Sequence, residues 1–186
     1  MKKTYEISVA GLKRHLQLFP ISDKLSIGAF IIFGDVELTC ACAQELLKKA
    51  PAHDVLVTAE AKSIPLIHEM ARQSGVNEYV IARKAPKLYM EDILTVTVRS
   101  ITTANEQSLC IGKREVDMIK GKRVLIVDDV ISTGESLTAV EKLVEKAGGI
   151  IVGRMAVLAE GDAQNRTDIT YLEGLPLFDS DGNPIK

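Results

Sequence analysis

Two adjacent carboxylates, Asp128 and Asp129, follow four apolar residues and precede a short run of small residues. That run contains Ser132, Thr133 and Gly134, and helical spacing begins directly after it. The backbone N–H groups of such a turn, together with the start of the helix, favour an anion, which is usually a phosphate. Because two carboxylates would repel a phosphate, we expect them to face hydroxyl groups or a metal ion that accompanies it. The pattern therefore predicts a ligand with an anionic end and a hydroxyl-bearing middle, such as a sugar phosphate with Mg²⁺.

The apolar pattern indicates the elements that position these residues. Residues 124–127 form a short apolar run with three β-branched members, which is typical of a buried strand in a parallel sheet. Apolar residues recur on one helical face between residues 137 and 147, and Gly148 with Gly149 is a stop signal. The alternative is an ordinary capped turn between a strand and a helix, which fits two acids alone better than it fits the whole pattern.

A second unit of the same kind lies earlier in the chain. Residues 54–58 indicate a strand, residues 59–63 a polar turn and residues 65–74 a helix, with Pro65 and Gly75 as start and stop signals. Since open α/β sheets bind ligands at the carboxyl ends of their strands, we expect both turns at one edge. The other predicted elements are strands at 4–9, 27–33, 77–82, 150–158 and 169–172, helices at 36–50 and 113–120, and a hairpin within 94–111.

Composition limits the class of protein. A chain of 186 residues with 46% hydrophobic residues predicts one domain, residues 1–186, with a real core. The net charge of −2 does not indicate a nucleic-acid partner. We find no signal peptide and no membrane-spanning run, and the three cysteines are odd in number, so we expect reduced thiols and a cytoplasmic location. Cys40 and Cys42 would point apart on a helix, which excludes a shared metal ion.

Residues 124–136 resemble the phosphoribosyl pyrophosphate (PRPP) signature of type I phosphoribosyltransferases. That signature is a hydrophobic strand, two acids, two variable residues, a small residue, Thr, Gly, one further residue and Ser or Thr. The resemblance covers most of the chain and is greatest to the adenine-specific, purine-using branch. It implies an α/β fold with a mostly parallel sheet flanked by helices. A small N-terminal hood, about residues 1–35, would cover a core of about residues 36–186.

The resemblance also implies an activity: transfer of the 5-phosphoribosyl group from PRPP to a purine, adenine being favoured, with release of pyrophosphate in nucleotide salvage. Xanthine or guanine as acceptor, or a PRPP-binding regulator without catalysis, are the alternatives. Mg²⁺ would be held mainly through PRPP and water, and the protein would be a homodimer without nucleic-acid or membrane partners.

Site residues follow from the same resemblance. Asp128 and Asp129 would be the catalytic residues and would hold the ribose hydroxyls. The remaining PRPP contacts would come from Ser132, Thr133, Gly134, Glu135 and Ser136. Pyrophosphate would be bound by Lys62, Arg83, Lys84 and Lys87, for which solvated surface positions are the alternative.

Two further segments concern the base. Ile32 and Phe33 match the apolar pair of the hood that contacts the purine, and burial in the core is the equally weighted alternative. The adenine-specific branch carries a Glu-Tyr pair in a loop that corresponds to residues 99–107, but this chain has no Tyr there. Glu106 is the candidate carboxylate of that loop, and both the acid/base role and the choice of base stay open.

Overall fold

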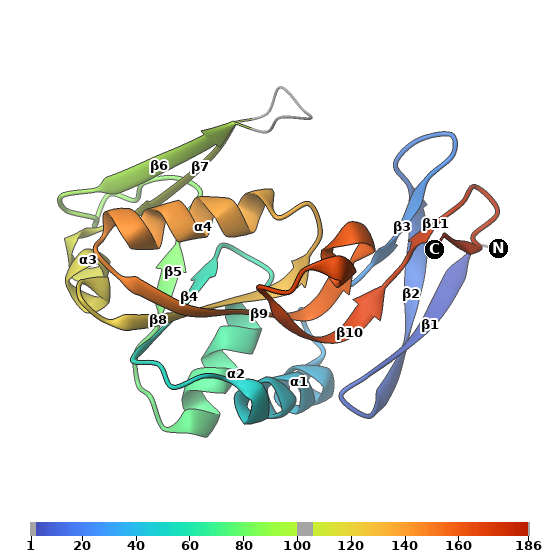
Figure 1. Cartoon of the computed structure of the whole chain (residues 1–186), viewed down its shortest axis with the longest axis horizontal. Coiled ribbons are helices and arrows are strands. Elements are labelled where there is room, and N and C mark those ends of the chain that lie inside the picture. Colours follow the sequence, from blue (N-terminus) through green and yellow to red (C-terminus); the bar gives the residue numbers. More distant parts are fainter. Residues whose placement is uncertain (1–2, 100–105, 186) are drawn as a thin grey trace.

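A sheet of five parallel strands forms the centre of the molecule (Figure 1). The computed structural model describes residues 3–99 and 106–185. In spatial order the strands are β10 (Thr170–Leu175), β9 (Ile150–Glu160), β8 (Arg123–Ile131), β4 (Val55–Ala59) and β5 (Val80–Ala82). The predicted α/β class with a mostly parallel sheet is therefore confirmed.

Helices cover both faces of this sheet (Figure 1). The helices α1 (Val36–Lys49) and α2 (Ile64–Ser74) lie on one face, and α4 (Glu135–Lys146) lies on the other. Side chains of a strand alternate between the two faces. Accordingly, Leu125 and Val127 of β8 pack in the cluster that contains α1 and α2, whereas Val124 and Ile126 pack in the α4 cluster. Each fully buried side chain of this size contributes roughly 1.5–3 kcal/mol through removal from water.

The strand β8 continues past the acids, whereas the apolar run predicts a strand only over residues 124–127. Val130 pairs with Leu158 and Ile131 pairs with Ala159 of β9, so the ladder extends to Ile131. Ile131 is buried, which gives the extension its own apolar anchor. Consequently Asp128 and Asp129 lie on a rigid strand rather than on a loop.

The ends of the helices follow the expected chemistry. Asp35 caps α1, because its Oδ1 accepts a hydrogen bond from the N–H of Leu38 at 3.0 Å. The helix α2 ends at Gly75 in the left-handed conformation (φ +73°), as predicted. The helix α4 begins after Gly134 (φ +81°), which a residue with a Cβ would adopt only with strain.

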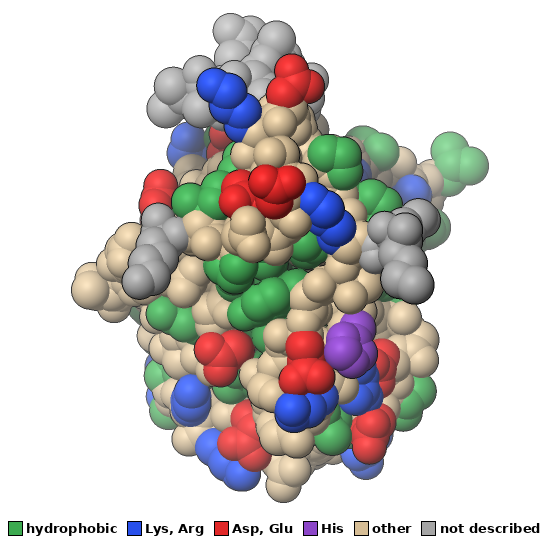
Figure 2. Space-filling view, turned by 90° about the vertical axis from the view of Figure 1, so that its right-hand side faces the viewer, with side chains coloured by type: hydrophobic (Ala, Val, Ile, Leu, Met, Phe, Trp, Pro, Cys, Tyr) green, Lys and Arg blue, Asp and Glu red, His purple; other side chains and the backbone are tan. Residues whose placement is uncertain are grey.

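The hood is an antiparallel sheet of β1 (Thr4–Val9), β2 (Leu12–Pro20), β3 (Ser26–Ala29), β11 (Leu177–Phe178) and β12 (Pro184–Ile185). The predicted hood segment, about residues 1–35, thus contributes three strands of this sheet, and two C-terminal strands complete it. Phe178 is fully buried and its ring centroid lies 4.9 Å from that of Tyr5. Figure 2 shows apolar side chains gathered in the middle of the face on the hood side, with charged side chains above and below.

The remaining elements stand beside the sheet. The strands β6 (Leu94–Arg99) and β7 (Glu106–Ile111) form the predicted hairpin beside α4, and α3 (Lys113–Ile119) follows (Figure 1). A 3₁₀ helix, η1 (Gly161–Asn165), follows β9. Residues 100–105 and the side chain of Glu106 lie outside the described part, and so does the predicted acid/base candidate of that loop. Within the described ranges, none of the helices has the length and apolar character needed to cross a membrane.

Candidate functional site

The two polar turns meet at one edge of the sheet, as the sequence predicts. Strands β4 and β8 are parallel neighbours, with Val57 opposite Ile126, so the residues after β4 lie beside the acids of β8. Nζ of Lys62, in the turn after β4, lies 2.8 Å from Oδ2 of Asp129. Residues separated by more than sixty positions in the chain thus face one another across a single cleft.

This cleft is a pocket of about 610 Å³, of the size that holds a small-molecule ligand. The residues that line it are Ala59, Glu60, Ala61, Lys62, Ser63, Lys84, Ser108, Leu109, Asp128, Asp129, Val130 and Ser136. It combines carboxylates, ammonium groups and hydroxyls, so it suits a ligand that is both anionic and rich in hydroxyl groups.

Ser63 connects the two acids. Its Oγ lies 2.5 Å from Oδ1 of Asp128 and 3.2 Å from Oδ1 of Asp129. The N–H of Asp129 donates to the same Oγ at 3.0 Å and also to Oδ1 of Asp128 at 2.9 Å. The acid pair is therefore held by hydrogen bonds from its own backbone and from the neighbouring turn.

The acid pair is electrostatically strained. Burial raises the pKa of Asp128 well above its usual value, and the nearby negative charge of Asp129 raises it further. The Ser63 hydroxyl acts in the opposite direction and lowers the pKa of Asp128. Asp129 is only 3% exposed, and its contact with Lys62 lacks the alignment of a hydrogen bond, so this contact is chiefly an attraction between opposite charges.

A second, smaller pocket of about 100 Å³ lies at the turn before α4. Its lining residues are Asp128, Val130, Ile131, Ser132, Thr133, Gly134, Ser136 and Leu137. Glu135 is the first residue of α4, and the first N–H groups of a helix have no acceptor within it. A small cavity beside Asp128 therefore lies at the turn predicted to bind an anion, and the binding itself stays a prediction.

The predicted basic residues fall into two groups. Lys62 and Lys84 line the larger pocket. Arg83 instead pairs with Glu60 at 3.2 Å. The N–H of Lys84 donates to the other oxygen of Glu60 at 3.1 Å, and this bond and Arg83 lower the pKa of Glu60. Lys87 is exposed and is not among the lining residues.

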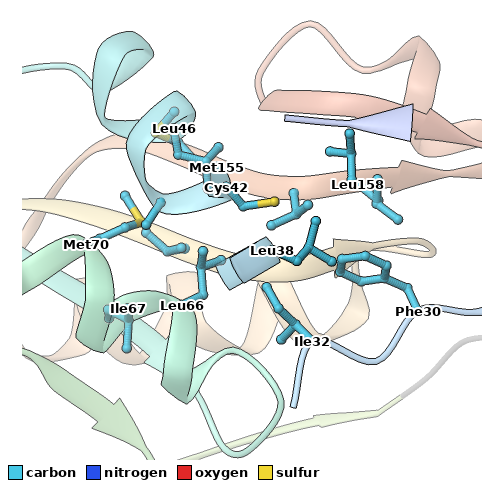
Figure 3. Packing of buried hydrophobic residues seen from close by; sticks show 14 of the residues in the cluster. Phe30, Ile32, Leu38, Cys42, Leu46, Leu66, Ile67, Met70, Met155 and Leu158 are labelled. Carbon is cyan, nitrogen blue, oxygen red and sulfur yellow. The ribbon is translucent and has the colours of Figure 1, made fainter. Parts of the chain in front are cut away.

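The two hood residues proposed for the base differ in exposure. Ile32 is fully buried and lies in the same core layer as Leu38 and Leu66 (Figure 3). Its side chain packs in the core, which supports the core alternative, and contact with the base stays a prediction. Phe33 is 48% exposed, so its ring could stack on a planar group.

Sequence reasoning missed three residues of this region. Ser63 precedes a helix and was given no role, because its partners lie 65 and 66 positions away. Glu60 anchors Arg83 and the backbone of Lys84. Arg166 lies against the anion-binding turn, since a Cβ on Gly134 would stand 2.6 Å from its Nη1. No local pattern in the sequence signals any of these three contacts.

The described residues do not form a complete metal cage. Within residues 3–99 and 106–185, no group of three His, Cys, Asp or Glu side chains is arranged to hold a metal ion. Hard cations such as Mg²⁺ keep several water molecules and ligand oxygens. The carboxylate of Asp128, which lines both pockets, is an oxygen donor of the kind that Mg²⁺ accepts. The three cysteines are free, and burial raises the pKa of the Cys42 thiol to about 12.

Comparison with protein families gives one clear match. Residues 40–184 match the model of the phosphoribosyl transferase domain. The hypoxanthine/guanine phosphoribosyltransferase of Methanococcus voltae is 38% identical over 113 residues, which are 61% of this chain and 56% of that protein. The adenine phosphoribosyltransferase of Oenococcus oeni is 34% identical over 128 residues, 66% of this chain and 67% of that protein. The hypoxanthine/guanine phosphoribosyltransferase of Methanocella arvoryzae is 30% identical over 172 residues, 91% of this chain and 83% of that protein.

Solved structures share the fold. The adenine phosphoribosyltransferase of Thermoanaerobacter pseudethanolicus superposes with a TM-score of 0.69 at 24% identity, covering 86% of this chain and 95% of that one. That of Saccharomyces cerevisiae gives a TM-score of 0.65 at 23% identity, covering 85% and 92%.

Proposed function

Because this chain belongs to the phosphoribosyltransferase family, we propose that it transfers the 5-phosphoribosyl group of PRPP to a purine and releases pyrophosphate. The observation that carries the proposal is the meeting of three features in one pocket. These are the acid pair Asp128–Asp129, the small cavity before α4, and the cations Lys62 and Lys84. Together they match the hydroxyls, the phosphate and the pyrophosphate of PRPP.

Each part of the donor has its own binding group in this proposal. Asp128 and Asp129 accept hydrogen bonds from the ribose hydroxyls, and residues Ser132–Ser136 hold the 5′-phosphate. Lys62 and Lys84 bind the pyrophosphate. Arg83 and Lys87 lie in the same loop as Lys84 and add further positive charge. Mg²⁺ brought by PRPP offsets part of the pyrophosphate charge when it is bound.

The residues act mainly by placement and charge. The ribosyl carbon acquires positive charge as its bond to pyrophosphate breaks, and the two carboxylates stabilise that charge. The departing pyrophosphate becomes more anionic, which the ammonium groups of Lys62 and Lys84 offset. Fixing both partners in one pocket removes most of the entropic cost of bringing them together.

Adenine is the first candidate for the acceptor, with hypoxanthine, guanine and xanthine as the alternatives. The relative from Oenococcus oeni supports adenine, whereas the two relatives from methanogens support the 6-oxopurines. The exposed ring of Phe33 is suited to stack on a planar base but does not distinguish the substituents of that base. The exocyclic group at purine C6 donates hydrogen bonds in adenine and accepts them in the others, so backbone groups of the hood would make the distinction.

A base panel tests the whole proposal. Purified protein with PRPP and Mg²⁺ is offered adenine, hypoxanthine, guanine and xanthine, and pyrophosphate release is measured. Release with one or more purines supports the enzyme and identifies its acceptor. PRPP binding without release for any base would favour a non-catalytic PRPP-binding regulator instead.

A homodimer is also part of the proposal. Leu88 is fully exposed and Tyr89 is 73% exposed, beside the basic loop that ends at Lys87. Adjacent exposed apolar residues of this kind support a protein contact. Sedimentation of the wild-type protein and of Leu88→Ser tests the proposed homodimer. A monomeric wild-type protein would contradict it.

A further inference from the structure

Ser63 joins the two turns of the site, since its hydroxyl contacts both acids. We propose that Ser63 is a positioning residue that holds the Asp128 carboxylate in the orientation required to accept the ribose hydroxyls. This inference rests on the proposed function and adds a residue to its machinery.

The hydrogen-bond geometry leaves the Ser63 proton little choice. The N–H of Asp129 donates to Oγ of Ser63 at 3.0 Å and so occupies an acceptor site of that oxygen. The single hydroxyl proton can then point to Oδ1 of Asp128 at 2.5 Å, while Oδ1 of Asp129 is more distant at 3.2 Å. A separation of about 2.5–2.7 Å is typical of a hydroxyl that donates to a charged carboxylate. One oxygen of Asp128 is therefore fixed by the protein, which leaves Oδ2 for a ligand.

The Ser63 hydroxyl does not cap the helix that follows it. Ser63 stands at the N-cap of α2, where a serine normally bonds to the N–H groups of the first turn. Here its side chain makes no capping hydrogen bond, and the residue has helical φ and ψ. Ser63 is also only 1% exposed, so solvent does not account for this orientation. A capping serine that faces two carboxylates instead of its own helix indicates a role in the site.

Charge explains why Asp128 needs this bond. The charged side chains that line the larger pocket with Asp128 are Asp129 on the same strand, Glu60 and Lys62 on the turn after β4, and Lys84. On the side of the small cavity, Arg166 lies against Gly134, and Glu135 is the next residue of the chain. Lys62 pairs with Asp129 rather than with Asp128. Among the described residues, the Ser63 hydroxyl is the side-chain donor that touches Asp128, and it opposes the effects of burial and of Asp129 on the pKa.

Ser63→Ala tests the role through its pH dependence. The expected result at neutral pH is a decrease of about tenfold or more in kcat/KM for PRPP and in the affinity for ribose 5-phosphate. The acidic limb of both profiles should move to higher pH. The ratio of variant to wild type should therefore rise at alkaline pH but stay below one, because the lost orientation of the carboxylate does not depend on pH. The ratio is compared because ionisation of the substrate phosphates affects both proteins equally.

Ser74→Ala is the matched control. It makes the same substitution at the other end of the same helix, away from the pocket. There the hydroxyl donates to the carbonyl of Met70 at 2.8 Å, and its loss should leave both profiles unchanged. No decrease in Ser63→Ala at any pH, or a decrease no larger than that of Ser74→Ala, would overturn the role. If Ser63→Ala does not fold, Ser63→Gly removes the same hydroxyl at an N-cap position that tolerates glycine, and a wild-type profile in that variant would also overturn the role.

The outcomes separate this role from the proposed catalysis. A wild type that binds ribose 5-phosphate with the expected shift in Ser63→Ala, but transfers phosphoribose to no base, removes the catalysis and supports the Ser63 role. A wild type that binds neither PRPP nor ribose 5-phosphate overturns both.

Discussion

Replacing Asp128 by asparagine should strongly reduce turnover while making the protein more stable at neutral pH and above. The asparagine keeps the size of the side chain and an oxygen that can accept the Ser63 proton at the 2.5 Å contact. It removes one of two adjacent carboxylates, and therefore both their mutual repulsion and the cost of burying the charge. It also removes a charged acceptor for the ribose hydroxyls and a charge that stabilises the developing cation, so we expect kcat/KM to fall by about 100-fold or more.

The sign of the stability change follows from linkage. The pKa of Asp128 is raised in the folded protein above its ordinary value of 3.8, so the folded state holds this proton more tightly than the unfolded state does. Its contribution to stability is therefore fully present below the ordinary pKa and is lost as the pH rises through the raised pKa. One pKa unit corresponds to about 1.4 kcal/mol. Because Asp128 is half-buried rather than sealed from water, we expect Asp128→Asn to gain ~1–2 kcal/mol at alkaline pH.

Urea unfolding at several pH values between about 5 and 8 measures this difference. The gain of Asp128→Asn over wild type should grow with pH and correspond to about 2–8 °C in Tm for a domain of this size. Asp54→Asn is the matched control, because Arg123 holds the pKa of Asp54 far below its usual range by a hydrogen bond at the opposite edge of the sheet. That variant should lose a little stability and keep its turnover.

Two results would refute the reasoning. If Asp128→Asn were less stable than wild type at pH 8, the acid pair would not be under electrostatic strain. If it turned over PRPP at the wild-type rate, Asp128 would not be a catalytic residue.

Three further predictions concern neighbouring parts of the structure. Lys62→Gln should weaken inhibition by pyrophosphate by about tenfold. It should also lower the free energy of unfolding in urea by ~1 kcal/mol, because Asp129 stays buried without its cation and the lysine is itself partly exposed. An unchanged inhibition constant would remove Lys62 from the pyrophosphate site. Asp35→Ala should lower the free energy of unfolding by ~2–4 kcal/mol, since Asp35 caps α1 and pairs with Arg14 of the hood at 2.6 Å; a cost below ~1 kcal/mol would contradict this. Gly134→Ala should raise KM for PRPP and lower Tm, because φ is +81° and the added Cβ would meet a guanidinium group; a variant with wild-type KM would show that the turn tolerates other conformations.

Much of the fold could be predicted because its signals are local. The apolar run 124–127 and the glycines after α4 and α2 mark element ends through their own chemistry. The extension of β8 to Ile131 could not be predicted, because two acids normally interrupt a strand and the pairing with β9 is a tertiary effect. The strand β11 has two residues and joins β3 about 150 positions away, so the hood's second part leaves no local pattern.

The site divides in the same way. The spacing of Asp128, Asp129 and the Thr-Gly turn predicts a cavity that the structure places beside α4. The sequence left open whether Ile32 packs in the core or contacts the base, because the same apolar residue suits both environments. Ser63 was missed because a serine before a helix is expected to cap it, and only the sheet order brings it to the acids.

The alternation of β8 side chains is consistent with the sugar phosphate that we propose as the ligand of the site. Asp129 lies on the same face of β8 as Leu125 and Val127 and pairs with Lys62 near α2. Asp128 lies on the opposite face and lines the small cavity before α4. A bare phosphate in that cavity would stand beside the Asp128 carboxylate, whose repulsion Lys62 offsets only partly because it is engaged with Asp129. A phosphate attached to a sugar places hydroxyl groups between the two charges, and these can donate to Asp128. Inorganic phosphate should therefore bind more weakly than ribose 5-phosphate, and Asp128→Asn should narrow that difference.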